Sequence, residues 1–492
     1  MKRLILTSIV IFAATTLTFS QLSLNQPNGY YIDGLRLSQN TYGGTARSAA
    51  LGGAFAALGG DMGSFSINPA GIGVYSLSEF AITPGFEMIN TSSNYLGNKN
   101  TDVDYKSNLG NIGVVFTYKS NNTSGWISSN FAFGYNRLNS YNNSYYIEGK
   151  TNTTSMVNEF LYYSQGKSPQ NLDDEWERLA YDAYVINPDT TAAAPNYKYT
   201  SPYTNINLLQ QHKLVISGSS GEYYFGFGAN YNNQLYLGAS LNIESSFYTE
   251  DLIHTEYDAN SVSYLSSYQF SNKIKTNADG FNLKLGAIYR PSDMFRLGLS
   301  FHTPTIMKVT QDYSSQIQSS LQNGNYYDLS GPGNTDEYNV TTPFSAVAGV
   351  AVIFKQLGLI SVDYEFIDYR SIHFSNGDYE SDLQAANQAN KNTFRATNNL
   401  RAGLELKFGS AYLRGGYAFY ASPYASGELN KDANTQIYSG GVGYRNNFFY
   451  LDFSYSLTNT SEKYYMYYDP NASVVNLSSN NGNILATIGF RF

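Results

Sequence analysis

The sequence predicts an all-β protein: a transmembrane, antiparallel, up-and-down β-barrel of fourteen strands whose lumen is plugged by an N-terminal segment. Three observations support this prediction. Fourteen segments alternate apolar with polar residues, short and long connections between them alternate strictly, and the chain ends on a strand with one apolar face that finishes with Phe492. Because successive side chains of a strand point to opposite faces, such segments can turn one face to lipid and the other to a lumen.

Residues 1–20 have the pattern of a secretory signal peptide. A positively charged Met-Lys-Arg start precedes a mostly apolar run, and small residues stand just before Gln21. We therefore expect cleavage after Ser20. No later segment approaches the roughly 18 uninterrupted apolar residues of a spanning helix, so the mature chain is expected to be exported without a helical anchor.

The composition suits a membrane barrel. The chain has 492 residues, of which 46 are Tyr, 29 are Phe and only 14% are charged. Tyr is favoured at membrane interfaces, where its ring and its hydroxyl can both be accommodated. The absence of Cys excludes disulfides and thiolate metal sites, and a net charge of −8 without basic blocks gives no support for a nucleic-acid partner. No linker divides the chain, so we expect a plug over residues 21–76 and a barrel over 77–492.

The candidate strands have at least the length that a tilted strand needs to cross a bilayer, about 9–11 residues. They cover residues 77–90, 107–119, 125–137, 221–231, 234–249, 278–290, 294–308, 341–354, 357–371, 396–408, 411–421, 435–445, 448–459 and 482–492. An even number of strands is what a bacterial barrel with both termini in the periplasm requires.

The connections strengthen this interpretation, because short turns such as 232–233 and 446–447 alternate with long ones. The long connections are 91–106, 138–220, 250–277, 309–340, 372–395, 422–434 and 460–481. Outer-membrane barrels have short periplasmic turns and longer extracellular loops. The segment 208–218 is assigned to the long second connection, which we expect to be partly helical, because a fifteenth strand would break the alternation.

The alternation also predicts which face of each strand meets lipid. Along 396–408, Leu400 and Leu404 share one face, whereas Arg401 and Glu405 share the other. A charged side chain facing lipid near the midplane costs about 2–4 kcal/mol, so the charged face should line the lumen. A large soluble barrel with its polar face outside is the alternative. The leader, the terminal Phe, the Tyr content and the pattern of connections favour the membrane.

The segment between the leader and the first strand is rich in Gly and Ala. Glycine pairs at 43–44, 52–53 and 59–60 punctuate it, and Asn-Pro-Ala-Gly follows at 68–71. Such residues allow the backbone to turn sharply and to pack closely, as a plug inside a lumen would require. A soluble periplasmic extension is the alternative. A phosphate-binding loop is not indicated, because the GxxxxGK[ST] pattern is missing.

This segment carries a resemblance to a known family. Residues 44–61 (GTARSAALGGAFAALGGD) together with 68–71 (NPAG) resemble the hatch of the FadL/TodX outer-membrane transporters, and the strand sequences 284–291, 295–304 and 413–419 agree. The likeness is to the Bacteroidota-like branch and spans almost the whole mature chain. It implies a fourteen-stranded barrel with an internal hatch. It also assigns hatch and gating roles to Asn68, Pro69, Ala70 and Gly71.

The resemblance implies uptake of hydrophobic small molecules, such as long-chain fatty acids or aromatic hydrocarbons, across the outer membrane of a Gram-negative cell. Members of the family capture ligands with outer loops, bind them in the lumen, and release them after the hatch moves, with exit thought to occur sideways at a kinked strand. A general diffusion porin or a structural barrel is the alternative, although a plug argues against an open pore. An enzyme is not expected, because the four His residues are scattered and lie outside HExxH or GxSxG patterns.

Two groups of residues are candidates for ligand contact. An anionic head group could bind inward-facing cations, unless these only pair with lumenal carboxylates. The candidate cations are Lys284, Arg296, Arg401, Lys407 and Arg414. In the second connection, Leu172, Trp176 and Leu179 recur at helical spacing and could form an apolar lid, unless they only fix the loop on the rim. The expected partners are the ligand, outer-membrane lipid and the barrel-assembly machinery, which would read the strand ending at Phe492. We expect a monomer with no cofactor and no metal.

Overall fold

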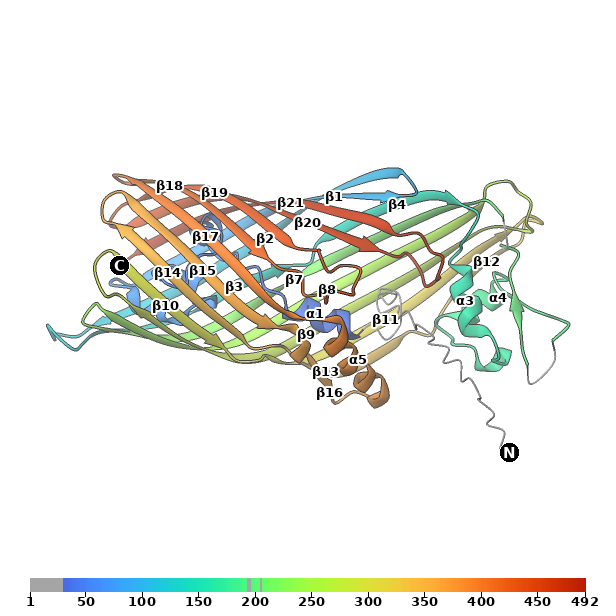
Figure 1. Cartoon of the computed structure of the whole chain (residues 1–492), viewed down its shortest axis with the longest axis horizontal. Helices are drawn as coiled ribbons and strands as arrows, with labels where there is room; N and C mark the ends of the chain where they lie inside the picture. Colours follow the sequence, from blue (N-terminus) through green and yellow to red (C-terminus); the bar gives the residue numbers. More distant parts are fainter. Residues whose placement is uncertain (1–29, 193–195, 204–205) are drawn as a thin grey trace, which may run out of the picture.

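The computed structural model describes residues 30–192, 196–203 and 206–492. The expected leader and residues 21–29 of the expected plug lie outside this range. Strands dominate the described residues and wind into an elongated barrel (Figure 1). None of the helices in the described residues is long and apolar enough to cross a membrane.

Fourteen antiparallel strands close the barrel, which confirms the predicted fold class and strand number. Each strand pairs with its sequence neighbour, and the first strand pairs with the last, from Glu79 opposite Arg491 to Asn94 opposite Asn476. In order, the strands are β1 (Glu79–Tyr95), β2 (Asn98–Lys119), β3 (Trp126–Ser140), β7 (Leu208–Tyr231), β8 (Leu235–Asp258), β9 (Leu265–Tyr289), β10 (Phe295–His302) continued by β11 (Ile306–Leu321), β13 (Asn334–Thr341) continued by β14 (Ser345–Phe354), β15 (Gly358–Asp368), β17 (Ala396–Phe408), β18 (Ala411–Tyr420), β19 (Thr435–Arg445), β20 (Phe449–Tyr464) and β21 (Val475–Arg491).

Smaller elements complete the chain. The N-terminal segment contains α1 (Tyr30–Ser38), α2 (Ala46–Ala50), η1 (Met62–Ser66) and η2 (Pro69–Val74). The connections contain β4 (Asn143–Thr151), α3 (Val157–Ser164), η3 (Pro169–Asn171), α4 (Glu177–Asp182), β5 (Asn187–Pro188), β6 (Tyr199–Thr200), β12 (Tyr326–Ser330), η4 (Tyr369–Ser371), β16 (His373–Ser375) and α5 (Glu380–Thr393).

At the end of the barrel opposite the short turns, the strands are much longer than the sequence predicts. The assignment of 208–218 to a loop is wrong, because these residues form the first half of β7 and pair with β8 along their length. Much of the predicted connections 91–106, 250–277 and 309–340 is likewise strand. These extensions do not need a lipid-facing apolar row, so they lack the alternation on which the prediction depended.

Two neighbouring strands that were predicted to be continuous are interrupted at the same level. The breaks are Thr303-Pro304-Thr305 between β10 and β11, and Thr342-Pro343-Phe344 between β13 and β14. Proline has no N–H to give to the ladder, which explains why both strands break there. On each side of the break the pairing continues with the same neighbouring strand.

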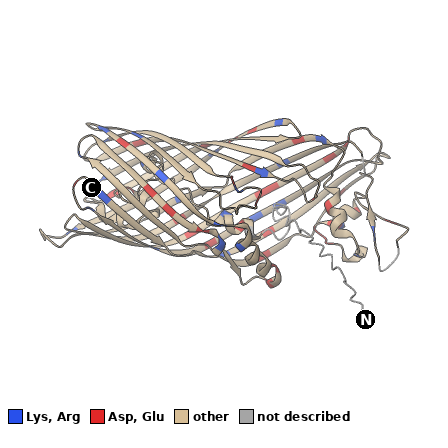
Figure 2. Ribbon diagram, viewed as in Figure 1, with Lys and Arg blue, Asp and Glu red and all other residues tan. Residues whose placement is uncertain are grey.

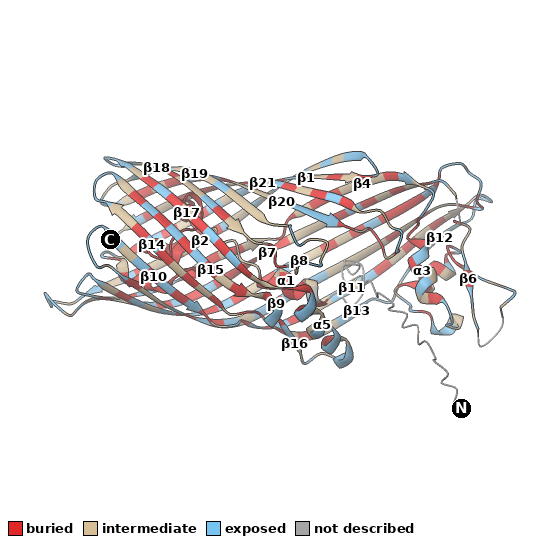
Figure 3. Cartoon of the chain, viewed as in Figure 1, coloured by how far each residue is buried: buried red, intermediate tan, exposed pale blue. Residues whose placement is uncertain are grey.

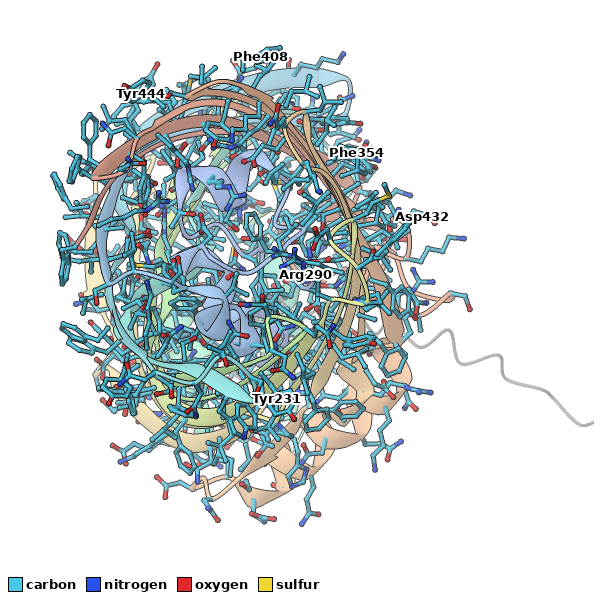
Figure 4. The ribbon with its side chains drawn as sticks, turned by 90° about the vertical axis from the view of Figure 1, so that its left-hand side faces the viewer. Tyr231, Arg290, Phe354, Phe408, Asp432 and Tyr444 are labelled. Atoms are coloured by element: carbon cyan, nitrogen blue, oxygen red, sulfur yellow. The ribbon has the colours of Figure 1, made fainter. Side chains whose placement is uncertain are left out.

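The faces of the strands agree with the predicted alternation. Along β17, Leu400 and Leu404 are exposed, whereas Arg401 and Glu405 are buried. Buried and exposed positions alternate along the strands of the barrel (Figure 3). Phe354, Phe408 and Tyr444 lie on the outer rim and point away from the lumen (Figure 4). Charged positions are sparse along the strands that carry this apolar belt (Figure 2). The apolar side chains therefore face outward, as a membrane barrel requires.

Candidate functional site

The N-terminal segment lies inside the barrel (Figures 1 and 4). It is seated on inward-facing glycines of the wall. A Cβ atom on Gly238 of β8 would lie 2.2 Å from the carbonyl oxygen of Pro69, which leaves no room for any side chain. A Cβ would also meet backbone atoms of the segment within 2.6 Å on four further strands, at Gly228, Gly298, Gly403 and Gly416, and side-chain atoms of Asn68 and Ala50 within 2.7 Å at Gly286 and Gly441. Backbone-to-backbone contact of this kind requires glycine, so these residues shape the seat.

Asn68 fixes the part of the segment that contains the Asn-Pro-Ala-Gly sequence. Its Nδ2 donates to the carbonyl oxygens of Ala56 at 2.6 Å and Ala287 at 3.2 Å, and its Oδ1 accepts from the N–H of Ala70 at 3.0 Å. The side chain thereby caps η2, which begins at Pro69. All four predicted hatch residues, Asn68, Pro69, Ala70 and Gly71, are buried against the wall.

Charged side chains also tie the segment to the wall. Arg47 of α2 donates through Nε to Glu405 at 2.8 Å, and the same carboxylate accepts from Arg414 at 2.7 Å. Arg414 in turn donates to Asp452 at 2.6 Å. This chain of ion pairs spans β17, β18 and β20, so one predicted cation, Arg414, lies between two carboxylates rather than beside open space.

Two further predicted cations contact the segment directly. Lys284 on β9 is paired with Glu222 at 2.5 Å, and its Nζ also donates to the carbonyl oxygen of Ser66 at 3.2 Å. Arg296 on β10 donates to the carbonyl oxygen of Leu58 at 2.6 Å. Both cations therefore already have acceptors on the wall or on the N-terminal segment.

The remaining two predicted cations differ from each other. Arg401 is buried, donates to Glu365 at 3.0 Å, and lies with its guanidinium carbon 4.9 Å from the centre of the Tyr42 ring. Lys407 is exposed near the short turn that follows β17. The structure thus places the predicted cations at separate points of the wall and does not bring them together around one head-group site.

Leu172, Trp176 and Leu179 lie in an apolar cap at the far end of the barrel from Phe492 (Figure 1). The ring of Trp176 lies 5.1 Å from that of Phe160 on α3 and 4.7 Å from that of Phe270 on β9. The predicted helix is shorter than expected: α4 begins after Trp176, and Leu172 precedes it in irregular chain. The second connection therefore packs onto the inside of the extended strands.

Polar groups under the cap hold its first residues in place. Glu256 on β8 accepts from the N–H of Met156 at 3.0 Å, from Gln210 at 2.7 Å, and also from the Ser155 hydroxyl. His254 lies 3.1 Å from the same carboxylate. Among the described residues, no group of three or more His, Asp or Glu side chains is arranged to hold a metal ion.

Three cavities adjoin one another, two inside the barrel and one in its wall. The upper cavity, about 320 Å³, lies between α1, the 421–434 connection and the outer parts of β20 and β21. The middle cavity, about 150 Å³, lies beside residues 41–53 of the N-terminal segment. The upper and middle cavities share lining residues, which are Thr41, Asn139, Ser140, Thr458 and Asn481.

The third cavity, the side cavity, measures about 590 Å³ and lies in the wall itself. It shares Asn108, Arg137 and Asn142 with the middle cavity, and it is also lined by outward-facing Tyr223 and Phe247. The cavity therefore joins the lumen to the outer surface of the barrel. None of the five predicted cations lines the three cavities.

The side cavity exists because the wall forks between β2 and β3. The two strands pair from Lys119 opposite Ser128 to Asn111 opposite Asn136, and no further. Beyond that point β2 pairs with β1, whereas the rest of β3 and then β4 pair with β7. A bulge between Arg137 and Asn139 accompanies the change of direction.

Beyond the fork, β4 steps into the lumen beneath the β1–β2 hairpin. The hydroxyl of Ser93 on β1 donates to the carbonyl oxygen of Tyr146 on β4 at 2.5 Å, and Thr91 makes the same contact to Ser144. Side chains of β1 face the backbone of β4 in these contacts, so the two strands overlap as layers instead of pairing edge to edge. The result is an opening in the wall at the level of the middle cavity.

Glu87 and Arg137, which lie at this fork, are not among the site residues predicted from the sequence. Each is a charged residue in a candidate strand that is otherwise almost uncharged. That signal was present in the sequence, but nothing in it indicated that the two residues would meet.

Solved structures provide the comparison for this architecture. The toluene transporter TodX of P. putida aligns with a TM-score of 0.54 at 12% identity, over 92% of this chain and 99% of that chain. A FadL homologue of Pseudomonas aeruginosa aligns equally well, with a TM-score of 0.54 at 12% identity, over 92% of this chain and 100% of that chain. The chain has the fold of these two proteins. No protein-family model and no curated protein sequence matches it.

Proposed function

We propose that the chain is a FadL/TodX-type transporter that moves hydrophobic small molecules across the outer membrane, and not an enzyme. The observation that carries the proposal is the opening at the β2–β3 fork, where the side cavity shares Asn108, Arg137 and Asn142 with the lumen. A water-filled pore gives no advantage to a solute that avoids water, whereas a side opening releases it directly into the apolar part of the membrane.

The route begins in the upper cavity and continues past the N-terminal segment to the side cavity. Long-chain fatty acids and aromatic hydrocarbons are the candidate ligands, since one protein of the same fold is a toluene transporter and another is a FadL homologue. The cap that contains Leu172, Trp176 and Leu179 is the candidate capture element. The candidate cations keep different roles: Lys284, Arg401 and Arg414 pair with carboxylates of the wall, Arg296 donates to the N-terminal segment, and Lys407 is exposed near a turn.

The N-terminal segment acts as the hatch in this proposal. Residues 46–74 stay on the glycine seat, because their movement would break the Arg47 and Asn68 contacts together with many backbone contacts. Hatch movement is therefore confined to residues 39–44, which line the upper and middle cavities and contain Gly43 and Gly44. This small rearrangement opens the passage from the upper cavity to the fork.

The location and partners form part of the same proposal. The barrel is proposed to lie in the outer membrane as a monomer, and its apolar belt supports the membrane location. Its last strand shows Ile484 and Phe490 on the outer face and is followed by the exposed Phe492, which suits recognition by the barrel-assembly machinery. The leader over residues 1–20 accounts for export.

Uptake of labelled oleate and toluene by cells that lack their own transporter tests the proposal. The full chain should support uptake, and purified protein in liposomes should not pass sugars. Leu109→Trp, at the edge of the side cavity, should reduce uptake several-fold. Leu241→Trp is the matched control, because Leu241 is an exposed leucine on the outer face of β8 away from the fork.

Two results would contradict the proposal. Rapid sugar flux through the intact chain would indicate a general diffusion porin, and no uptake of either ligand would indicate a structural barrel. Deletion of residues 21–76 separates the hatch from the barrel: the shortened protein should pass sugars that the full chain excludes. A shortened barrel that folds and stays closed to sugars would show that the segment is not a hatch.

A further inference from the structure

An ion pair crosses the fork on its lumenal side. Arg137 on β3 donates from its two terminal nitrogens to the two carboxylate oxygens of Glu87 on β1, at 2.5 Å and 3.4 Å. Strand β2 lies between β1 and β3 and pairs with both strands near this level. Glu87 of β1 lies opposite Lys106 of β2, and Asn136 of β3, the neighbour of Arg137, lies opposite Asn111 of β2. The pair therefore bridges the two strands that flank β2.

Further donors hold Glu87 from the inward-stepping side of the fork. The hydroxyl of Ser140 and the Nδ2 of Asn142 each donate to Oε2 of Glu87 at 2.9 Å. Asn142 also accepts from the N–H of Gly218 on β7 at 3.0 Å, which fixes its orientation. If Arg137 turned away, the carboxylate of Glu87 would keep two donors and would not be left unpaired.

The pair lies where the lumen meets the opening. Arg137 lines both the middle and the side cavity, whereas Glu87 lines the middle cavity only. The side chain of Arg137 is 11% exposed and that of Glu87 is 9% exposed, so the pair is largely shielded from water. A molecule that passes from the middle cavity to the side cavity must therefore pass the guanidinium of Arg137.

The surroundings of the pair suit an amphiphile. Lys106, which is paired with Asp104 at 3.0 Å, is a second cation that lines the side cavity. Leu109, Tyr223 and Phe247 provide apolar surface on the lipid side. The cations lie where the lumen meets the side cavity, and the apolar groups lie on the lipid side. This arrangement matches a ligand that has an anionic head and a hydrophobic tail.

We infer that the Glu87–Arg137 pair is a crossbar in the transport route that selects ligands with an anionic head group, such as a carboxylate, over neutral ones of the same shape. This inference rests on the proposed function. An incoming carboxylate replaces Glu87 as the acceptor for the Arg137 donors, while Ser140 and Asn142 keep Glu87 satisfied. A neutral ligand offers no such exchange, so it must separate a shielded ion pair without compensation.

Competing uptake of laurate and 1-dodecanol, which have the same chain length and different heads, tests the inference in cells that carry the full-length protein. Arg137→Gln should lower laurate uptake about tenfold, as expected for the loss of one charged hydrogen bond. It should raise dodecanol uptake, because it removes the ion pair that a neutral ligand must separate. Arg137→Lys should recover part of the laurate uptake. Glu87→Gln should raise dodecanol uptake, because it weakens the crossbar and leaves the fold of the strand intact.

Arg445→Gln is the matched control. Arg445 is also in a shielded ion pair, with Asp452 at 2.6 Å, and lines none of the three cavities. Asp452 retains Arg414 when Arg445 is removed, just as Glu87 retains Ser140 and Asn142. This variant should take up both ligands as the unchanged protein does.

The outcomes distinguish the inference from the proposed function. Equal loss of laurate and dodecanol uptake in Arg137→Gln, or no loss of either, overturns the head-group role while transport itself stands. If Arg137→Gln fails to reach the membrane, the Glu87→Gln result decides, and unchanged dodecanol uptake in that variant overturns the crossbar. Failure of the unchanged protein to take up either ligand refutes the proposed function instead.

Discussion

Lys284 and Glu222 form an ion pair of 2.5 Å between strands β9 and β7, and both side chains are almost completely buried. Among the described residues, Oε1 of Glu222 has no hydrogen-bond partner. Lys284 also contacts the backbone of the N-terminal segment at Ser66. One cation thus joins the wall to the segment that fills the lumen.

Lys284→Met is therefore expected to destabilise the protein by about 3–5 kcal/mol, because it leaves a buried carboxylate without its counter-ion. The urea midpoint of the protein refolded in micelles measures this loss. Lys308→Met is the control, since Lys308 pairs with Glu337 at 2.8 Å in an exposed position. Solvent screens such a pair, so the control should hardly change the midpoint. Equal losses in both variants would contradict the interpretation of a buried pair.

The glycine seat gives a second prediction. Gly238→Ala places a methyl group 2.2 Å from the carbonyl oxygen of Pro69, where only backbone shifts can relieve the clash. We expect a loss of about 1–3 kcal/mol, the range for an overpacked site. Gly415→Ala on β18 is the matched control, since a Cβ there meets nothing within 4 Å. Heat-modified migration in SDS gels and urea midpoints of both variants check the prediction, and a stable Gly238→Ala protein would refute the seat.

The cap gives a third prediction. Trp176→Ala removes a ring that packs between Phe160 and Phe270, at a local cost of about 3–5 kcal/mol. The second connection should then loosen, and trypsin should cut faster after Lys167 and Arg178. Tyr162→Ala is the control, because its ring is 61% exposed. Identical cleavage rates in the two variants would show that Trp176 does not hold the cap.

Glu159 makes the cap sensitive to pH. Burial on α3 raises the pKa of Glu159 to about 8, partly offset by the N–H of Tyr468, which donates to it. A carboxyl whose pKa is raised in the folded state contributes stability below its unfolded pKa and loses it as pH rises through the folded pKa. The cap should therefore be most protected from hydrogen exchange at low pH, and this protection should fall as the pH rises from about 4.5 to about 8.

Hydrogen exchange of α3 at the two ends of this range measures the effect. Glu159→Gln cannot ionise, so it should abolish the pH dependence of α3 while leaving that of the barrel strands unchanged. A variant with the same pH dependence as the unchanged protein would exclude Glu159 as its source.

The sequence was sufficient for those parts of the strands that carry a lipid-facing row. The predicted segments 396–408 and 435–445 coincide with β17 and β19. Alternation is a local property, because a strand between lipid and lumen must change polarity at every residue. Alternation does not identify residues 208–218 and most of 265–277 as strand, because both faces of these segments can be polar or covered by the cap.

The candidate site was less accessible from the sequence. The inward direction of Arg401, Arg414 and Lys284 followed from alternation, but their partners did not. Leu172, Trp176 and Leu179 were correctly grouped as apolar, although only part of this stretch is helical. Helical spacing describes which residues share a face and does not decide whether a short segment closes its hydrogen bonds as a helix.

The sequence alone determined a fourteen-stranded barrel with an apolar outer face, because periodicity, turn lengths and the terminal Phe are all local features. Only the tertiary structure decided where the wall opens and which charged residues lie at the opening. The inward step of β4 depends on contacts with β1 and β7, and Glu87 meets Arg137 across a separation of 50 residues. Hydrogen-bond registers and ion pairs between distant strands are set by the closure of the whole barrel, so no local pattern could specify them.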